Sequence, residues 1–489
     1  MTSRSIIINP VTRVEGHGKI EIFLNDIGDV DKAYFQVPEL RGFEKFCEGR
    51  AAEEMPILTS RICGVCPTAH HIASSKALDA LYRVDPTSAA KKIRELMYTA
   101  FLMEDHALHF FFLGGPDFIV GTQAPASQRN ILGVIAKVGK ETAGKVIRLR
   151  KECRKIMETI GGTAIHPVFG LPGGVSKPLT EDDRKKIKEV AKYGVEFYRF
   201  ALKIFDDVVL KNKEYVDLIA GDIYKIKTYY MGMVDEENKV SFYDGQIRVV
   251  DPDGKEYAKF KPEDYLHHIA EHVEPWTYMK FTYLKNIGWK GFIDGKDSGI
   301  YRVAPLARLN VSEGMTTTLA QIEYERMYDT LGAKPLHNTL AFHWARLIEG
   351  LYAAERMTEL ADDPELTDPN IRNLPKEAPS EGIGAIEAPR GTLIHHYKAD
   401  EKGLIRDVNL IVSTQNNAAA ICMSIEKAAS NFIKGGNVSE GLLNMVEIAF
   451  RAYDPCLGCA THSFPGDMPM LIKIYDKNRN LIQEIGRDY

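Results

Sequence analysis

Arg61-Ile-Cys-Gly-Val-Cys-Pro-Thr-Ala-His70 places two cysteines three positions apart, directly before a segment with helical periodicity. A second segment, Asp454-Pro-Cys-Leu-Gly-Cys-Ala-Thr-His462, repeats this arrangement near the other end of the chain. In each segment two thiols lie within one turn of backbone and an imidazole follows, so both sulfurs can contact one ion. Four soft thiolates suit zinc, an iron–sulfur cluster or nickel, and the ligand type alone does not choose among them.

The distance in sequence between the two cysteine pairs indicates whether they form a local site or a site at the centre of the fold. A zinc ribbon places its two pairs about 15 to 20 residues apart, whereas about 390 residues lie between Cys66 and Cys456. We therefore expect one site at the centre of a large fold, assembled from both ends of the chain. The remaining cysteines, Cys47, Cys153 and Cys422, are expected to be small buried hydrophobic side chains.

The composition is that of a globular protein. Its 489 residues include 62 Lys and Arg against 67 Asp and Glu, which gives a net charge of −5, and 45% are hydrophobic. These proportions exclude extended disorder, and they leave no basic field for nucleic acid. The most apolar run, 108–120, is interrupted and shorter than the roughly 18 residues that a membrane-spanning helix needs. Since the N-terminus lacks a signal-peptide pattern, we expect a cytoplasmic protein without structural disulfides.

Helical periodicity dominates after a short β region. Within residues 5–37, the stretches 5–9, 19–24 and 32–37 alternate apolar and polar side chains and predict a small hairpin sheet. Helices are predicted over 69–82, 86–113, 141–160, 180–210, 338–357 and 415–433. Thr180 is expected to cap the fourth of these, with Asp183 three residues later.

Two further stretches are predicted to be less regular. Residues 221–305 are rich in Asp, Gly and Tyr, and the turn Asp251-Pro-Asp-Gly254 separates two strand-like runs. Residues 362–387, with four prolines and many acids, are expected to form a surface loop. The predicted fold class is mainly α (α+β), with one large domain, residues 1–462, built around a bundle of long helices with small peripheral β-sheets.

Six blocks along the chain resemble, in order, the large catalytic subunit of the [NiFe] hydrogenases. They are Pro10–His17, Arg41–Glu44, Arg61–His70, Asp105–His109, Glu387–Gly391 and Asp454–His462. The resemblance covers nearly the whole chain and implies reversible cleavage of H2 into protons and electrons. It also implies the roles of individual residues described below.

The resemblance implies that the four cysteines hold nickel, with Cys63 and Cys456 as terminal ligands. Cys66 and Cys459 would also bridge to an iron that carries CO and two cyanides. Glu44 and His462 resemble the ligands of a nearby Mg²⁺, together with a backbone carbonyl within 409–411. The pocket around the cyanides would come from Pro389, Val412, Ser413 and Thr414. The chain departs from the commonest pattern at Val412 and Gln415, where many relatives have Pro and Trp.

The same resemblance assigns the handling of protons. A terminal thiolate such as Cys456, or Arg390, would take the proton, although an arginine is a poor base at its ordinary pKa. Glu15 resembles the carboxylate that passes the proton outward, and Asp105 and Asp454 resemble the acids that pair with Arg390. Two of these residues also have a structural alternative: Glu15 as a structural cap and Asp105 as a satisfied polar group of the core.

The resemblance also implies partner chains. The cysteines left over form no pattern that could hold electron-transfer clusters, so an obligatory iron–sulfur small subunit is expected to receive the electrons. Arg41–Arg50 and Gln415-Asn-Asn417 resemble the cytoplasmic multimeric group, whose acceptor modules are a heterodisulfide reductase or viologen-reducing module, an NAD(P) module, or a deazaflavin module. We favour the first. Since no nucleotide-binding glycine motif is present, NAD or a deazaflavin would bind a partner chain.

The C-terminal residues 463–489 resemble the extension that a nickel-dependent maturation endopeptidase removes after His462. Within this extension, 468–475 alternates enough to predict a strand.

Two other functions remain open at the level of sequence: an H2-sensing regulatory homologue, and a metal-free structural protein of a redox complex. His268-Ile-Ala-Glu-His272 also matches the inverted zinc-protease pattern, with both histidines on one helical face. A match this short arises by chance in a long chain, so we expect a solvated or interface helix there.

Overall fold

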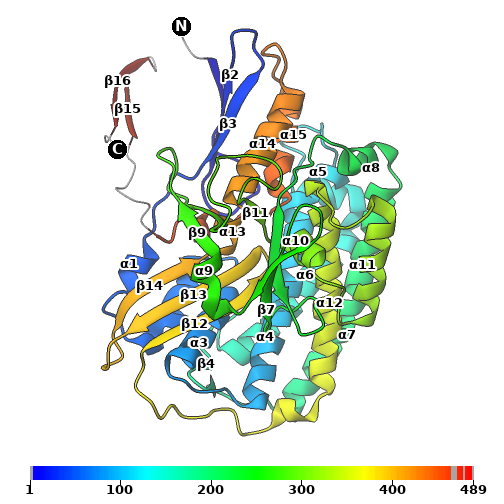
Figure 1. The fold of residues 1–489 in the computed structure, drawn as a ribbon. Helices are drawn as coiled ribbons and strands as arrows, with labels where there is room; N and C mark the ends of the chain where they lie inside the picture. Colours follow the sequence, from blue (N-terminus) through cyan, green and yellow to red (C-terminus); the bar gives the residue numbers. More distant parts are fainter. Residues whose placement is uncertain (1–3, 464–470, 477–479, 487–489) are drawn as a thin grey trace.

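The computed structural model describes residues 4–463, 471–476 and 480–486. Five of its longer helices lie side by side as a bundle, which appears on the right of Figure 1. They are α4 (Ser88–Leu108), α6 (Ile131–Gly161), α7 (Glu181–Phe205), α11 (Thr318–Leu331) and α12 (Phe342–Asp362). α12 packs against α4, α7 and α11, so it runs through the middle of the bundle. The prediction of a fold built around long helices is confirmed.

Three further helices have a similar length to α11. They are α3 (Pro67–Leu81), α14 (Ala418–Phe432) and α15 (Glu440–Arg451). The shorter helices are α1 (Phe43–Cys47), α2 (Met55–Thr59), α5 (Pro116–Ile119), α8 (Lys213–Ala220), α9 (Tyr265–His268), α10 (Pro305–Val311), α13 (Ser413–Asn416) and α16 (Leu457–Ala460). No helix among the described residues is long and apolar enough to cross a membrane.

The strands form small sheets around the helices. Antiparallel sheets are made by β1 (Arg4–Ile8), β2 (Lys19–Leu24) and β3 (Val30–Gln36), and by β12 (Glu381–Ala388), β13 (Gly391–Ala399) and β14 (Ile405–Ile411). A mixed sheet has the order β11 (Tyr301–Arg302), β6 (Tyr229–Val234), β7 (Gln246–Val250), β8 (Glu256–Phe260). Two-stranded sheets pair β4 (Gly170–Leu171) with β5 (Gly174–Val175), β9 (Ile269–His272) with β10 (Phe281–Leu284), and β15 (Leu471–Tyr475) with β16 (Leu481–Gly486). Small sheets around the helices were predicted and are confirmed, but β12 and β13 are mostly buried rather than peripheral.

Most predicted elements are found within a few residues of their expected bounds. Thr180 caps α7, and its hydroxyl accepts a hydrogen bond from Asp183 N at 3.1 Å while the Asp183 carboxylate accepts from Thr180 N, as expected for a capping box. The predicted helix 141–160 is the second part of α6, which bends at Gly139 because that residue has a φ of +86°. The predicted helix 86–113 ends its α-helical part at Leu108 and continues as a π-helical turn to Gly114.

Two predictions are wrong. The end of the expected surface loop 362–387 is instead the buried strand β12, whose Gly382 and Gly384 let α3 approach so closely that an added Cβ would lie 2.3 Å from α3 backbone atoms. The glycines that permit this packing also remove the usual β signal from the sequence. The expected helix at His268–His272 is mostly strand: α9 ends at His268 and β9 follows it.

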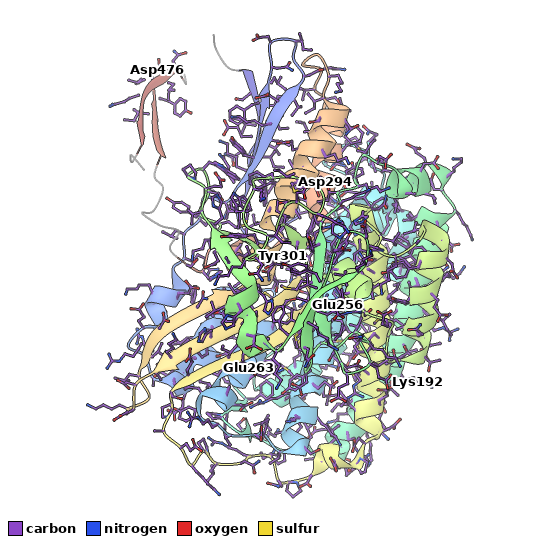
Figure 2. The ribbon with its side chains drawn as sticks, in the orientation of Figure 1. Lys192, Glu256, Glu263, Asp294, Tyr301 and Asp476 are labelled. Carbon is purple, nitrogen blue, oxygen red and sulfur yellow. The ribbon has the colours of Figure 1, made fainter. Side chains whose placement is uncertain are left out.

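The strand predicted near the C-terminus, over residues 468–475, is confirmed only in part. Leu471–Tyr475 is a strand, as predicted, whereas Met468–Met470 of the predicted strand lie outside the described residues. Side chains fill the space between the ribbons, as Figure 2 shows, with Lys192 at the outer edge of α7 and Tyr301 in the interior. One continuous cluster of buried apolar side chains runs from Val11 to Ala460 and includes all four cysteines of the two pairs.

Candidate metal centre

Both cysteine pairs are held at turns where a helix begins. Cys63 follows a 3₁₀ turn, and Cys66 directly precedes α3, whose first residue is Pro67. Proline suits this position because its fixed φ is already helical and its missing N–H would have no partner there. Cys456 likewise precedes the short helix α16, and Cys459 lies within it. The two Cys-x-x-Cys segments therefore turn their sulfurs inward in the same way.

The four sulfurs meet in the protein interior. Cys63 Sγ lies 3.2 Å from Cys456 Sγ, and Cys66 Sγ lies 3.3 Å from Cys459 Sγ. All four lie within 4.8 Å of one another, and each cysteine is at most 5% exposed. Among the described residues this is the one group of three or more His, Cys, Asp or Glu side chains that could hold an ion together. The expected assembly of one site from both ends of the chain is what the geometry shows.

The charge balance of this group fits a cation. Burial raises the pKa of Cys456 and Cys459 well above the usual thiol value, and the hydrogen bonds of the other three thiols lower the pKa of Cys63. Four thiolates packed this closely and removed from water would repel one another strongly unless positive charge lay between them. Soft sulfur ligands at such distances suit zinc, nickel or iron, and a bound metal would keep the thiols deprotonated.

Glu15 lies against the Cys456 sulfur. Its Oε2 is 3.0 Å from Cys456 Sγ and accepts a hydrogen bond from Gly458 N at 3.0 Å. The backbone joins the same two segments, because Leu457 N donates to Glu15 O at 3.0 Å. Burial, and then the nearby charge of Cys63, raise the pKa of Glu15. A carboxyl group with a raised pKa, in contact with a thiol, is equipped to exchange a proton with it.

Arg390 lies at the tip of a two-residue hairpin. The register of β12 with β13 pairs Ala388 with Gly391, so Pro389 and Arg390 form the turn. Gly391 has a φ of +122°, and an added Cβ would lie 2.1 Å from Val303, so only glycine fits there. The tight turn aims the Arg390 side chain at the cysteines, and the cavity beside them is lined in part by Arg390.

Two buried acids hold this guanidinium. Arg390 Nη1 lies 3.3 Å from Asp105 Oδ1, and Nη2 lies 2.9 Å from Asp454 Oδ2. Burial opposes the charge on Arg390, but the two carboxylates outweigh it and hold its pKa well above the usual value. Burial raises the pKa of Asp105 to about 6 and also raises that of Asp454. Arg390 is therefore a fixed cation beside the sulfurs, which makes it a worse base than Cys456 or Glu15.

A further group of buried charged residues, which the sequence did not reveal, also holds the hairpin in place. Arg308 of α10 donates to the carbonyls of Ala388 and Pro389 at 2.8 and 3.0 Å. The same guanidinium pairs with Glu349 at 2.6 Å and with Glu387 at 2.7 Å, and all three side chains are fully buried. No spacing rule links residues 308, 349 and 387, so only the packed helices bring them together.

Glu44, His462 and the carbonyl of Leu410 meet at a second point. His462 Nε2 lies 2.7 Å from Leu410 O and 3.5 Å from Glu44 Oε1, while His462 Nδ1 lies 2.9 Å from Cys459 O. A neutral imidazole has a single N–H, so it cannot donate to both carbonyls. A hard cation between Nε2, the Leu410 carbonyl and Glu44 would satisfy all three acceptors, with Nδ1–H donating to Cys459 O. The arrangement therefore fits a bound Mg²⁺.

The cavity beside the sulfurs is small, with a volume of about 10 Å³. Val412, Ser413 and Thr414 line it, together with Ala388 and Leu393, which the sequence did not single out, whereas Pro389 does not. Thr414 Oγ1 accepts from Cys456 N at 2.9 Å, so its hydroxyl hydrogen can point into the cavity.

The other sequence candidates lie elsewhere. His268 stacks on Phe260 with a centroid distance of 3.9 Å, and His272 stacks on Trp289 at 4.4 Å. They do not form a metal site among the described residues. Cys47, Cys153 and Cys422 are buried free thiols whose pKa burial raises, as expected for small hydrophobic side chains.

A family model described as nickel-dependent hydrogenase matches residues 41–140 and 217–462, and a HoxL-like model matches residues 5–40. The chain belongs to the nickel-dependent hydrogenase family. This hydrogenase is 49% identical to an F420-non-reducing hydrogenase iron-sulfur subunit of Archaeoglobus profundus, over 99% of each chain. It is 38% identical to the NAD-reducing hydrogenase HoxS subunit beta of Cupriavidus necator, over 99% of this chain and 100% of that one.

Comparison with solved structures shows the same family relationship in the fold. The hydrogenase superposes on an NAD⁺-reducing [NiFe]-hydrogenase in the H2-reduced state with a TM-score of 0.88 and 38% identity, covering 94% of this chain and 99% of the other. The fold class is thereby that of the [NiFe]-hydrogenase large subunit, and the chain is a nickel-dependent oxidoreductase.

Proposed function

We propose that this chain is the catalytic subunit of a hydrogenase that interconverts H2 with two protons and two electrons at a Ni–Fe(CN)2CO centre. The observation that carries the proposal is the convergence of four buried sulfurs beside Glu15 and Arg390. Cys63 and Cys456 would bind nickel alone, and Cys66 and Cys459 would also contact iron. When bound, the metals would supply the redox chemistry that takes the two electrons of H2.

The protein's own groups would then handle the proton. The sulfur of Cys456 lies 3.0 Å from Glu15 Oε2, a distance across which a proton can move directly. Arg390, kept charged by Asp105 and Asp454, would act electrostatically beside the sulfurs rather than as a base. Val412, Ser413 and Thr414 would surround the small iron ligands, with Arg390 and the neighbouring Pro389 at the hairpin turn.

An infrared spectrum of the purified complex tests the centre. We expect bands of iron-bound CO and cyanide. A fully processed, nickel-containing enzyme without such bands would contradict the proposed iron ligands. Two other functions make different predictions: a regulatory H2 sensor would carry the bands with negligible turnover, and a metal-free structural protein would contain no nickel.

Replacing Glu15 with glutamine is expected to slow H2 oxidation by a factor on the order of 100 or more, because an amide cannot carry the proton. The isosteric side chain keeps its oxygen near Cys456, so nickel content should stay unchanged. H2-dependent viologen reduction and elemental analysis measure both quantities. Glu21→Gln, in strand β2 shortly after Glu15, is the control and should retain wild-type turnover. A Glu15→Gln enzyme that turns over normally would remove Glu15 from the proton path.

We propose that Glu44, His462 and the Leu410 carbonyl hold Mg²⁺. Glu44→Gln removes the charged ligand and is expected to weaken magnesium binding by about 10- to 100-fold, a typical cost for losing a group around a metal. Magnesium and nickel measured together after dialysis should show magnesium falling first. Glu48→Gln is the matched control, because Glu48 follows α1 at the surface and pairs with Lys45. Retention of magnesium by Glu44→Gln would place the ion elsewhere.

We propose that electrons leave through an iron–sulfur small subunit, and then through a further acceptor module. Several relatives belong to multi-chain hydrogenases named F420-non-reducing, which supports a heterodisulfide reductase or viologen-reducing module over a deazaflavin module. The relative named NAD-reducing keeps an NAD module as the alternative. Affinity purification of the native complex and identification of its chains would decide between them.

We propose that residues 1–462 form the catalytic domain and that a maturation endopeptidase removes 463–489. His462 and Ser463 are both buried, and His462 O accepts from Glu44 N at 3.0 Å. Cleavage there would therefore have to precede this packing, and the mass of the chain in the active complex tests it.

Seven buried free cysteines suit a reducing compartment, so we also propose a cytoplasmic location.

A further inference from the structure

Glu15 lies on a short loop whose two ends are joined through the backbone. Val11 N donates to Gly18 O at 3.0 Å and closes the loop. The same loop contacts the second cysteine segment, where Leu457 N donates to Glu15 O and Gly458 N donates to Glu15 Oε2, each at 3.0 Å. The position of Glu15 in the site therefore depends on how the rest of this loop is held.

Arg13 turns the chain within the loop. Its φ is +57°, which lies in the left-handed region that residues with a side chain rarely adopt. Its guanidinium donates to Leu113 O at 2.8 Å and to Asp117 Oδ1 at 2.5 Å. Because these bonds fix the side chain, they also hold the backbone of Arg13 in a conformation that is unfavourable by itself.

Thr12, the neighbouring residue, is held by side chains of α15. Thr12 N donates to Glu447 Oε1 at 3.1 Å. Arg451 Nε donates to Thr12 O at 3.1 Å, and Arg451 Nη2 donates to Thr12 Oγ1 at 3.0 Å. Arg451 is the last residue of α15, shortly before Cys456. The residue that holds the Glu15 loop therefore also begins the segment that leads to Cys456.

Asp117 joins the two arginines. Its carboxylate accepts from Arg13, and its Oδ2 lies 3.2 Å from Arg451 Nη1. Asn444 Oδ1 accepts from both guanidinium groups, at 3.3 and 2.8 Å, and Asn444 Nδ2 donates to Asp117 at 3.2 Å. Asp117, Asn444 and Arg451 are each 1% exposed, so water cannot replace these bonds. The cluster therefore holds Thr12 and Arg13 in fixed positions.

We propose that Arg13, Asp117 and Arg451 are positioning residues that place Glu15 against Cys456. They act through the backbone of the loop, and a misplacement of about 1 Å between reacting groups can slow a reaction by about 100-fold. The inference rests on the proposed function, since it takes Glu15 as the partner of Cys456 in proton transfer. In that transfer the proton leaves the sulfur, which keeps the bonding electron pair, and joins a carboxylate oxygen of Glu15.

Hydrogen exchange of the purified complex, measured by mass spectrometry on peptides covering 455–460, tests the placement without relying on activity. Arg13→Met removes both guanidinium bonds, and methionine does not favour a positive φ, so the loop should loosen. The two amides that donate to Glu15 should then exchange faster by about 10-fold or more, as expected when a hydrogen bond to a charged group is weakened. Asp117 keeps Arg451 as its cation, so the fold should persist.

Arg129→Met is the matched control. Arg129 is almost completely buried and lies 4.0 Å from the same Asp117 carboxylate. Its hydrogen bonds, however, go to Ala124 O at 2.7 Å and to Glu440 Oε1 at 3.4 Å. Exchange in 455–460 should therefore match that of the wild-type complex.

Turnover per nickel separates positioning from a merely structural role. Arg13→Met should lower this turnover by about 10- to 100-fold while the KM for H2 stays unchanged. In a Glu15→Gln enzyme the same substitution should add little further loss, because it acts through Glu15. A merely structural effect would instead multiply with the loss caused by Glu15→Gln.

Thr12→Val is a milder substitution that stands even if Arg13→Met fails to fold. It removes only the hydroxyl that Arg451 contacts, so it should give smaller changes of the same kind. Wild-type exchange in both variants, or losses of turnover that multiply with Glu15→Gln, would overturn the inference. Normal turnover of Glu15→Gln by itself would instead overturn the proposed role of Glu15, and the inference with it.

Discussion

Replacing Cys456 with serine is expected to abolish H2 oxidation, with H2-dependent viologen reduction falling by more than about 100-fold, the upper range found for groups that only support a metal ligand. Nickel content should fall with the activity. A serine hydroxyl does not ionise near neutral pH and is a hard ligand where the site offers soft sulfur. The substitution also takes away the group that lies 3.0 Å from Glu15, so the route for the proton is lost together with the metal ligand.

The control for this experiment is another buried thiol. Cys422 lies on α14 and, like Cys456, is almost completely buried, but it belongs to no cluster among the described residues that could hold a metal. Burial raises its pKa to about 12, so it stays protonated and inert. Cys422→Ala should keep nickel and activity near the wild-type values. Equal losses in Cys456→Ser and Cys422→Ala would mean that the cysteines act through packing alone.

Replacing Arg390 with methionine is expected to destabilise the protein by about 3–5 kcal/mol, because it leaves two buried carboxylates without their cation. Asp105 and Asp454 are 0% and 3% exposed, so water cannot replace the guanidinium. H2 oxidation should fall as well, since the fixed positive charge beside the sulfurs is gone. The apparent thermal midpoint of the purified complex and viologen reduction measure the two effects.

The loss of stability in Arg390→Met should depend on pH in a defined direction. Burial already raises the pKa of Asp105 to about 6, and removal of Arg390, which lowers it, should raise it further. An acid whose pKa is higher in the folded than in the unfolded state loses stability as the pH rises through that interval. Arg390→Met should therefore be much closer to wild type at pH 5, where Asp105 is protonated, than at pH 8. An equal loss at both pH values would contradict the pairing.

A surface pair provides the comparison. Arg83 and Glu377 lie 2.8 Å apart, but their side chains are 64% and 54% exposed. Exposed pairs of this kind contribute about 0–1 kcal/mol, because water solvates both charges and holding the long side chains in place costs entropy. Arg83→Met should leave the thermal midpoint and the activity almost unchanged. The contrast between the two arginines isolates the effect of burial.

The structure also bears on a hypothesis about Arg390 that came from the sequence. The family resemblance left open whether Arg390 or a terminal thiolate takes the proton. The two carboxylates at 3.3 and 2.9 Å hold the guanidinium in its charged form, so the structure favours the thiolate and Glu15. A residue type alone could not decide this, since the pKa of a side chain depends on what surrounds it.

The local sequence pattern determined most of the helices and strands and the types of the candidate ligands. Helical periodicity predicted the bundle, and the N-cap Thr180 was correct to the residue because it depends on neighbours within one turn of chain. The Cys-x-x-Cys spacing likewise determined that two sulfurs in each segment can face one ion. Prediction failed at β12, where Gly382 and Gly384 fit against α3, and at His268–His272, where a helical spacing lies on a strand. At β12 the packing partner α3, distant in sequence, outweighs the local signal, and at β9 the pairing with the neighbouring strand β10 does so.

Tertiary structure alone decided which groups meet. Asp105 on α4, Arg390 on a hairpin turn and Asp454 near the C-terminus form one ion cluster. Arg308, which pairs with Glu349 and Glu387, holds the same hairpin through the carbonyls of Ala388 and Pro389. The contact between His70 and His395, whose ring nitrogens lie 3.1 Å apart, likewise exists only because α3 packs on the β12–β13 sheet. The sequence by itself determined the types of the candidate ligands and their spacing within each segment, because these are local properties. The fold decided distance, burial and charge balance, because these arise only when segments far apart in the chain are packed together.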